Sequence, residues 1–169
     1  VLLACSAQAT ARVVEDVAPD AARELRRIPH VSTASLLLAY ERRDVPHALD
    51  ASGVLIPRRE GREASAITFM TSKWKGRAPE DVAVLRVFLG GHARPEVRGM
   101  TDADLLAVAR RELEVVLGVR AEPITTQVFR WNDARPQPVL GHLERVARIR
   151  ASIAETPGLD IAGAALDEV

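Results

Sequence analysis

The stretch VSTASLLLAYE at residues 31–41 decides the fold that this sequence predicts. Its residues are mostly apolar or β-branched, and it contains neither glycine nor proline, which is typical of a central strand. A second run, VLRVFL at residues 84–89, ends at Gly90-Gly91 and predicts another strand. Residues 53–57 and 64–70 flank the charged, turn-like sequence RREGR and predict a hairpin. The centre of the fold is therefore expected to be a sheet.

The clearest helix signal lies at residues 101–117. Thr101 is the expected N-cap, Asp102 and Asp104 stand in the first turn, where the helix dipole favours anions, and Gly118 is the expected terminator. One face carries the apolar residues Leu105, Ala109, Leu113, Val116 and Leu117. This amphipathic pattern predicts that the helix packs against the sheet.

Three further segments predict helices. Residues 6–17 and 19–28 predict two short ones, the second beginning at Pro19 and ending before Pro29. Residues 140–154 predict a longer helix whose core-facing residues are Leu143, Val146, Ile149 and Ile153. Its arginines, Arg145, Arg148 and Arg150, are expected to lie mostly off this core-facing side, where they either hold an anion or form a solvated face.

Strands are also predicted at residues 1–5, 122–132 and 159–163. The chain begins and ends in such apolar segments, so we expect it to be a piece of a longer protein. Strands gathered before one long helix predict an α+β fold, with a mixed or antiparallel sheet packed with helices.

The composition argues against several classes of protein. The 169 residues include 23 basic and 23 acidic ones, and a net charge of zero does not favour a general nucleic-acid-binding protein. No apolar run approaches the roughly 18 residues of a membrane-spanning helix. The single cysteine, Cys5, excludes an internal disulfide and fits a cytoplasmic location. We interpret Cys5 as a small buried side chain of the first strand.

The residues alone reveal no self-contained catalytic site. Four histidines are scattered without the spacing of a metal site, so neither a metal site nor catalytic residues are predicted. The basic stretch SKWKGRAP at residues 72–79 allows two interpretations. It either holds a carboxylate or phosphate, or forms a solvated loop with Trp74 in the core. Gly90-Gly91 lacks a phosphate-binding pattern and is interpreted as a turn.

Four stretches, in this order, point to a known family. They are VLLACSA (1–7); ITFMTSKW (67–74) with RAP (77–79) and LRVFLGG (85–91); RW (130–131) with PQ (136–137) and GHLERV (141–146); and PGLDIAG (157–163). In these stretches the sequence resembles the C-terminal part of the flavin-dependent protoporphyrinogen and coproporphyrinogen oxidases of haem biosynthesis, within the flavin amine oxidase superfamily. The resemblance covers essentially the whole chain, and its second and third stretches are the most specific.

The resemblance implies an FAD-dependent, six-electron oxidation of a cyclic tetrapyrrole, with dioxygen reoxidising the flavin. It implies that residues 31–135 form a substrate-binding α+β domain, that residues 1–30 return from an FAD domain, and that residues 136–169 lead back to it. The family's Gly-x-Gly-x-x-Gly unit and membrane-contacting helical insert are absent from these 169 residues. The chain alone is therefore expected to be inactive, and any peripheral membrane contact is expected through sequence outside it.

The resemblance also implies site residues. Trp131, Ala162 and Gly163 are expected to lie against the FAD of the intact protein. Lys73 and Arg77 are candidates to bind the carboxylates of the tetrapyrrole substrate, because they flank Trp74 in the most family-like stretch. No nucleic-acid partner is expected.

The sequence departs from the family pattern at three positions. Pro138 and Leu166 stand where an aromatic residue is usual, and Glu168 stands where a glycine is expected. These departures motivate an alternative hypothesis, a non-catalytic binding module or degenerate relative that keeps the fold. An upstream glycine-rich βαβ unit in the full-length sequence would favour the enzyme.

Overall fold

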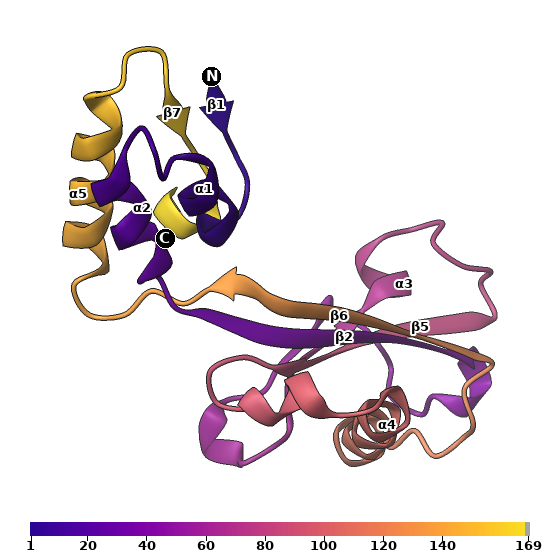
Figure 1. The fold of residues 1–169 in the computed structure, drawn as a ribbon. Coiled ribbons are helices and arrows are strands. Elements are labelled where there is room, and N and C mark those ends of the chain that lie inside the picture. The colour runs from indigo at the N-terminus through magenta and orange to yellow at the C-terminus, as the bar shows by residue number, and fades with distance from the viewer. Residues whose placement is uncertain (168–169) are drawn as a thin grey trace. The chain divides into compact units, whose positions relative to one another are not determined.

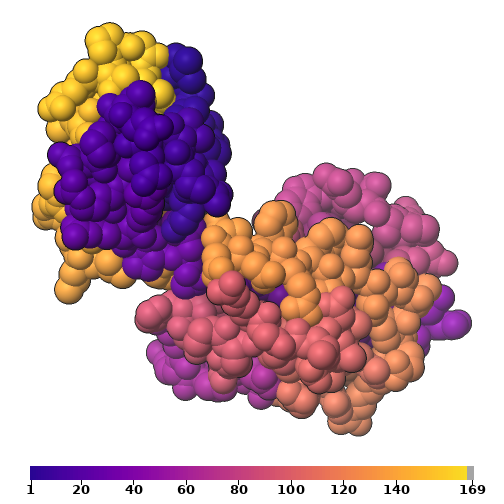
Figure 2. Space-filling view, in the orientation of Figure 1, coloured from indigo at the N-terminus to yellow at the C-terminus, as the bar shows by residue number. Residues whose placement is uncertain are grey.

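The structure is a computed structural model that describes residues 1–167. The chain forms two compact units. The sheet unit comprises Ser32–Asn132, and the terminal unit combines Val1–Val31 with the chain from Asp133 onward. The terminal unit therefore contains both the indigo start and the yellow end of the chain, whose atoms pack together (Figures 1 and 2).

A five-stranded sheet forms the centre of the sheet unit, as the sequence predicts. Its strands are β2 (His30–Glu41), β3 (Gly53–Leu55), β4 (Ala64–Phe69), β5 (Val82–Gly90) and β6 (Thr125–Pro136), in the order β3-β4-β5-β2-β6. The pairs β2–β5, β3–β4 and β4–β5 are antiparallel, with Leu36 opposite Val87. The predicted α+β fold class is confirmed.

Helix α4 (Asp102–Leu117) buries one face of this sheet. Strand side chains alternate between faces, so Leu36 and Leu38 of β2 share a core with Leu85 and Val87 of β5 and with the apolar stripe of α4. Thr101 caps the helix and forms a capping box with Asp104, and Gly118 ends it in the left-handed conformation at φ 73°. The predicted bounds and caps of this helix are confirmed.

Short elements connect the strands. They are the 3₁₀ helices η1 (Arg42–Asp44), η2 (Arg58–Glu60) and η3 (Pro95–Gly99) and the single-turn helix α3 (Met70–Lys73). The charged tip of the predicted β3–β4 hairpin contains η2. In Figure 1, α4 lies below the sheet, whereas α3 lies above β5.

Gly90 ends β5 where the backbone comes close to β2. Its φ is 95°, and a Cβ there would lie 2.7 Å from the carbonyl oxygen of Ser32. The next residue, Gly91, donates its N–H to the same carbonyl at 2.9 Å. The Gly-Gly pair therefore ends the strand with a turn, as the sequence predicts.

The terminal unit packs helices beside a short two-stranded sheet. Strands β1 (Leu2–Leu3) and β7 (Asp160–Ile161) pair in parallel, and the helices are α1 (Ala7–Val13), α2 (Pro19–Arg26), α5 (His142–Ala154) and α6 (Ala164–Asp167). Apolar residues of α1, α2 and α5, including Ala11, Leu25 and Ile149, form its core. The predicted helices are confirmed with shorter bounds.

Two predicted core positions in the terminal unit are wrong. Leu143 is 79% exposed, because His142, Val146, Ile149 and Ile153 form the buried stripe of α5 and Leu143 lies one residue from it. Cys5 is exposed rather than buried, since β1 ends at Leu3 and Ser6 then caps α1. The Cys5 Sγ lies 3.2 Å from the hydroxyl oxygen of Thr10.

Candidate functional site

Trp131 lies in β6, an edge strand of the sheet, and is 51% exposed. Its neighbour Arg130 turns toward the start of α4, where its Nε donates to the Asp102 carboxylate at 2.8 Å and its Nη2 donates to the Met100 carbonyl at 2.7 Å. Successive strand residues point to opposite faces, so Trp131 lies on the face away from α4. Its indole offers that face an exposed, flat apolar surface.

Arg86 projects from the same face near the middle of β5. Its neighbours Leu85 and Val87 belong to the core between the sheet and α4, so the Arg86 side chain lies on the face of the sheet away from α4. Its Nη2 donates to the Ser35 hydroxyl at 3.1 Å, and its guanidinium carbon lies 4.7 Å from the centroid of the Phe88 ring. Sequence patterns did not single out Arg86, although one charged residue inside the run VLRVFL is a usable signal.

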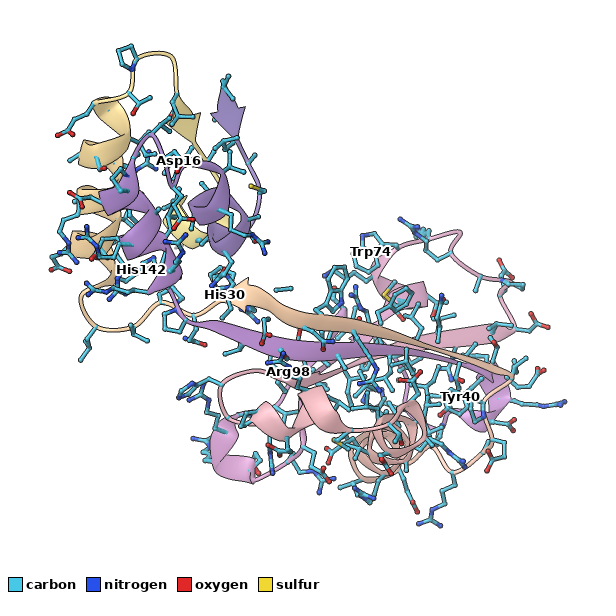
Figure 3. All side chains as sticks on the ribbon, viewed as in Figure 1. Asp16, His30, Tyr40, Trp74, Arg98 and His142 are labelled. Atoms are coloured by element: carbon cyan, nitrogen blue, oxygen red, sulfur yellow. The ribbon has the colours of Figure 1, made fainter. Side chains whose placement is uncertain are left out.

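The predicted basic stretch at residues 72–79 begins in α3, whose last two residues are Ser72 and Lys73. Lys73 Nζ lies 4.6 Å from the centroid of the Trp74 ring. Trp74 is 39% exposed, so the interpretation that it lies in the core is wrong: α3 is a single turn, and the chain leaves it in an exposed loop (Figure 3). Lys73 and Arg77 are also exposed, and neither forms an ion pair with a described residue.

Ala162 and Gly163 follow β7 in the terminal unit. The N–H of Ala162 donates to the Leu3 carbonyl at 3.0 Å and extends the parallel pairing. Gly163 adopts φ 137°, a conformation that residues with side chains rarely take, and α6 begins directly after it. A Cβ at Gly163 would lie 3.8 Å from the Cys5 carbonyl oxygen, so the conformation of this turn, more than lack of space, favours glycine.

The predicted site residues are divided between the two units. Trp131, Lys73 and Arg77 belong to the sheet unit, whereas Ala162 and Gly163 belong to the terminal unit. Among the departures from the family pattern, Pro138 is exposed, and Leu166 packs against the core of the terminal unit. Glu168 lies outside the described residues.

A cleft of about 290 Å³ lies beside α4 in the sheet unit. Tyr40, Arg110 and Arg120 are among its lining residues, but Arg110 pairs with Glu122, and Arg120 pairs with Glu114 at 3.1 Å. Burial raises the pKa of Tyr40 to about 12, so its phenol remains protonated at neutral pH. With its arginines already paired, this cleft is a weaker anion site than the sheet face around Arg86.

The described residues contain neither a metal-binding cluster nor a membrane-spanning helix. In residues 1–167, no three His, Cys, Asp or Glu side chains gather in a way that could hold a metal ion. Over the same residues, no helix combines the length and apolar character needed to cross a membrane.

Comparison with known proteins places the chain in a family. The sequence-family model for flavin-containing amine oxidoreductases matches residues 1–167. The chain belongs to this family. The coproporphyrinogen III oxidase of Mycobacterium bovis is 37% identical over 170 residues, which cover 100% of this chain and 36% of that protein. The coproporphyrinogen III oxidase of Propionibacterium freudenreichii subsp. freudenreichii is 36% identical over 174 residues, which cover 100% of this chain and 32% of that protein.

Solved structures agree with this assignment. An Exiguobacterium sp. 255-15 protein, provisionally named a protoporphyrinogen oxidase, matches with a TM-score of 0.76 and 30% identity over 98% of this chain and 36% of that chain. Reduced UDP-galactopyranose mutase matches with a TM-score of 0.77 at 11% identity, over 97% of this chain and 36% of its own, which shows a shared fold alone. The resemblance to porphyrinogen oxidases is confirmed, and the chain spans about a third of the length of these relatives.

Proposed function

We propose that the protein containing this chain is an FAD-dependent porphyrinogen oxidase of haem biosynthesis, and that this chain supplies its substrate-side part. The observation that carries the proposal is the identity of 36–37% to coproporphyrinogen III oxidases over the whole of this chain. The reaction would convert coproporphyrinogen III or protoporphyrinogen IX to the corresponding porphyrin, with dioxygen as the electron acceptor.

The side chains of the sheet unit support this substrate class. A porphyrinogen is a broad apolar ring system with carboxylate arms, so its site should combine apolar walls with a few cationic donors. Trp131 and Phe88 are partly or largely exposed aromatic residues, and Arg86, Lys73 and Arg77 form no ion pair with the described residues. This combination suits a flat acidic ligand better than a neutral amine.

FAD would be held by the residues that the family resemblance implies. Ala162 and Gly163 would receive the cofactor along a backbone without bulky side chains, and Trp131 would offer it an aromatic surface. When bound, the flavin accepts hydride, which is the demanding chemistry of the oxidation. The residues of this chain would bind and orient the substrate and cofactor.

The proposal extends to domain roles and location. Residues 31–135 would form the substrate-binding domain, while residues 1–30 and 136–169 would belong with an FAD-binding domain supplied by the rest of the protein. A cytoplasmic location is proposed because the chain contains a single cysteine and no pair for an internal disulfide. Any contact with a membrane surface would come from sequence outside this chain.

Porphyrin formation tests the proposal directly. Full-length protein loaded with FAD is mixed with coproporphyrinogen III or protoporphyrinogen IX in air, and porphyrin fluorescence is followed with matched FAD-free and protein-free controls. Flavin-dependent porphyrin formation is expected, with dioxygen consumed. Binding of the porphyrin product without turnover of either porphyrinogen would instead favour the non-catalytic alternative.

A further inference from the structure

Arg86 is a half-buried cation without a carboxylate partner among the described residues. An arginine guanidinium remains charged at all physiological pH values, so burying it is costly unless its charge is compensated. Arg62 shows the usual solution, because it donates two hydrogen bonds to Glu112, at 3.0 and 3.1 Å. Among residues 1–167, the partners of Arg86 are instead the Ser35 hydroxyl and the Phe88 ring.

The described strand neighbours of Arg86 supply no compensating charge. Leu37 of β2 and Thr68 of β4 lie opposite it on the neighbouring strands. Val84 and Phe88 are the next residues of β5 on the same face. All four side chains are uncharged, so the strand residues around Arg86 offer its guanidinium no counter-charge.

Two nitrogens of the guanidinium lack a hydrogen-bond partner among the described residues. Nε is buried, and over residues 1–167 neither Nε nor Nη1 has a hydrogen-bond partner. Buried polar groups are normally satisfied by protein groups, ordered water or a ligand. Ser35 is buried and holds Nη2, so it orients the guanidinium without neutralising it.

We propose that Arg86 binds a carboxylate of the tetrapyrrole substrate and that Ser35 positions its guanidinium for this contact. The assignment rests on the proposed function, which supplies the acidic ligand. An apolar macrocycle would lie along the sheet face that Phe88 and Trp131 share with Arg86, while one carboxylate arm pairs with the guanidinium. A fork of N–H donors matches the two oxygens of a carboxylate, and this match favours arginine over lysine.

Binding of a charged and an uncharged porphyrin tests the assignment. Full-length protein with FAD is titrated with coproporphyrin III and with its tetramethyl ester in the same mild detergent, and the dissociation constants are measured by fluorescence. The variants are Arg86→Met, Arg86→Lys and Ser35→Ala. Arg94→Met is the matched control, because Arg94 lies in the loop after β5 and already pairs with Glu96 at 3.6 Å.

A charged group that loses its partner typically weakens binding by about 10- to 100-fold. Arg86→Met is expected to weaken coproporphyrin III binding by about this factor while changing ester binding by less than about twofold. Arg86→Lys should recover part of the loss, Ser35→Ala should cause a smaller loss for the acid alone, and Arg94→Met should leave both ligands unaffected. Flavin content and melting temperature confirm that each variant is folded, and Arg86→Gln replaces Arg86→Met if the latter does not fold.

Two results would overturn the assignment while leaving the proposed function intact: unchanged binding of coproporphyrin III to the folded Arg86 variants, or equal losses for the acid and the ester. A wild-type protein that neither binds coproporphyrin III nor oxidises a porphyrinogen would overturn the proposed function itself. The wild-type activity therefore separates the failure of one proposal from the failure of the other.

Discussion

Arg148 of α5 donates a hydrogen bond of 2.8 Å to the buried carboxylate of Glu24 in α2. Arg27 donates a second hydrogen bond of 2.8 Å, and Arg145 lies 3.6 Å away with only 17% of its side chain exposed. The expectation that the α5 arginines lie mostly off the core-facing side agrees with the exposed Arg148 and Arg150, whereas Arg145 is half-buried. One buried acid in α2 gives these cations a structural role between the two helices.

Glu24→Gln should destabilise the terminal unit by about 1–3 kcal/mol at pH 7, because charge-assisted hydrogen bonds to two arginines are weakened. The hydrogen bond from Arg148 is the main reason that the pKa of Glu24 lies below its ordinary value of 4.5. A lowered pKa stabilises the fold above the unfolded-state pKa, and this contribution is lost as the pH falls through the folded-state pKa. Urea unfolding should show that the gap between wild type and variant shrinks below about pH 4. A gap that stays constant down to pH 3 would contradict this account.

Arg62→Met should destabilise the sheet unit by about 3 kcal/mol, since removing one partner of a buried ion pair leaves the other charge uncompensated. Glu112 is only 2% exposed, and it also accepts a hydrogen bond from the Glu63 N–H at 3.3 Å. Arg59→Met is the control, because Arg59 lies exposed near the same hairpin tip. Thermal unfolding compares the two variants, and equal melting temperatures would count against a structural role for the Arg62–Glu112 pair.

Gly90→Ala should destabilise the protein more than Gly91→Ala. Both residues have positive φ, so both substitutions carry a conformational penalty of about 1–2 kcal/mol. Only at Gly90 would the new Cβ meet backbone, at 2.7 Å from Ser32 O, whereas no atom lies within 4 Å of a Cβ at Gly91. Chemical unfolding of both variants measures the difference, which should exceed about 1 kcal/mol. Indistinguishable stabilities would mean that the β5–β2 contact can relax without cost.

Trp131→Ala should lower flavin occupancy or turnover in the full-length protein more than Trp74→Ala does. The tryptophans are 51% and 39% exposed, so neither substitution should unfold the protein, and only Trp131 belongs to the segment assigned to the cofactor. Flavin absorbance per folded protein and the rate of porphyrin formation test this expectation. Equal losses in both variants would remove the special role of Trp131.

Lys73→Met and Arg77→Met test two exposed cations of the basic stretch at residues 72–79. If either side chain binds a substrate carboxylate, its variant should raise the KM for coproporphyrinogen III by about 10- to 100-fold. Lys75→Met is a matched control from the same exposed loop. If the KM changes by less than about twofold in both test variants, residues 72–79 form a solvated loop that does not bind the substrate. The proposed role of Arg86 would be unaffected.

Local sequence signals predicted most of the secondary structure. Thr101 and Gly118 predicted both ends of α4, and the apolar runs predicted β2 and β5, because capping and alternation act within one element. The prediction for Leu143 is wrong because Leu143 and His142 both have helical spacing to Val146, and the apolar pattern favoured the leucine over the histidine. Packing against α2, which sequence periodicity does not encode, selected the stripe that begins at His142.

The sequence by itself also determined the family, since its four stretches resemble porphyrinogen oxidases over nearly the whole chain. Only the tertiary structure decided which charges are compensated. Glu24 and Arg148 are 124 residues apart in the chain and meet only when α2 packs on α5. Arg86 resembles any other strand arginine until β5 lies between β2 and β4, where the neighbouring residues are Leu37 and Thr68. Charge compensation depends on distances of a few ångströms between residues remote in sequence, and folding alone sets those distances.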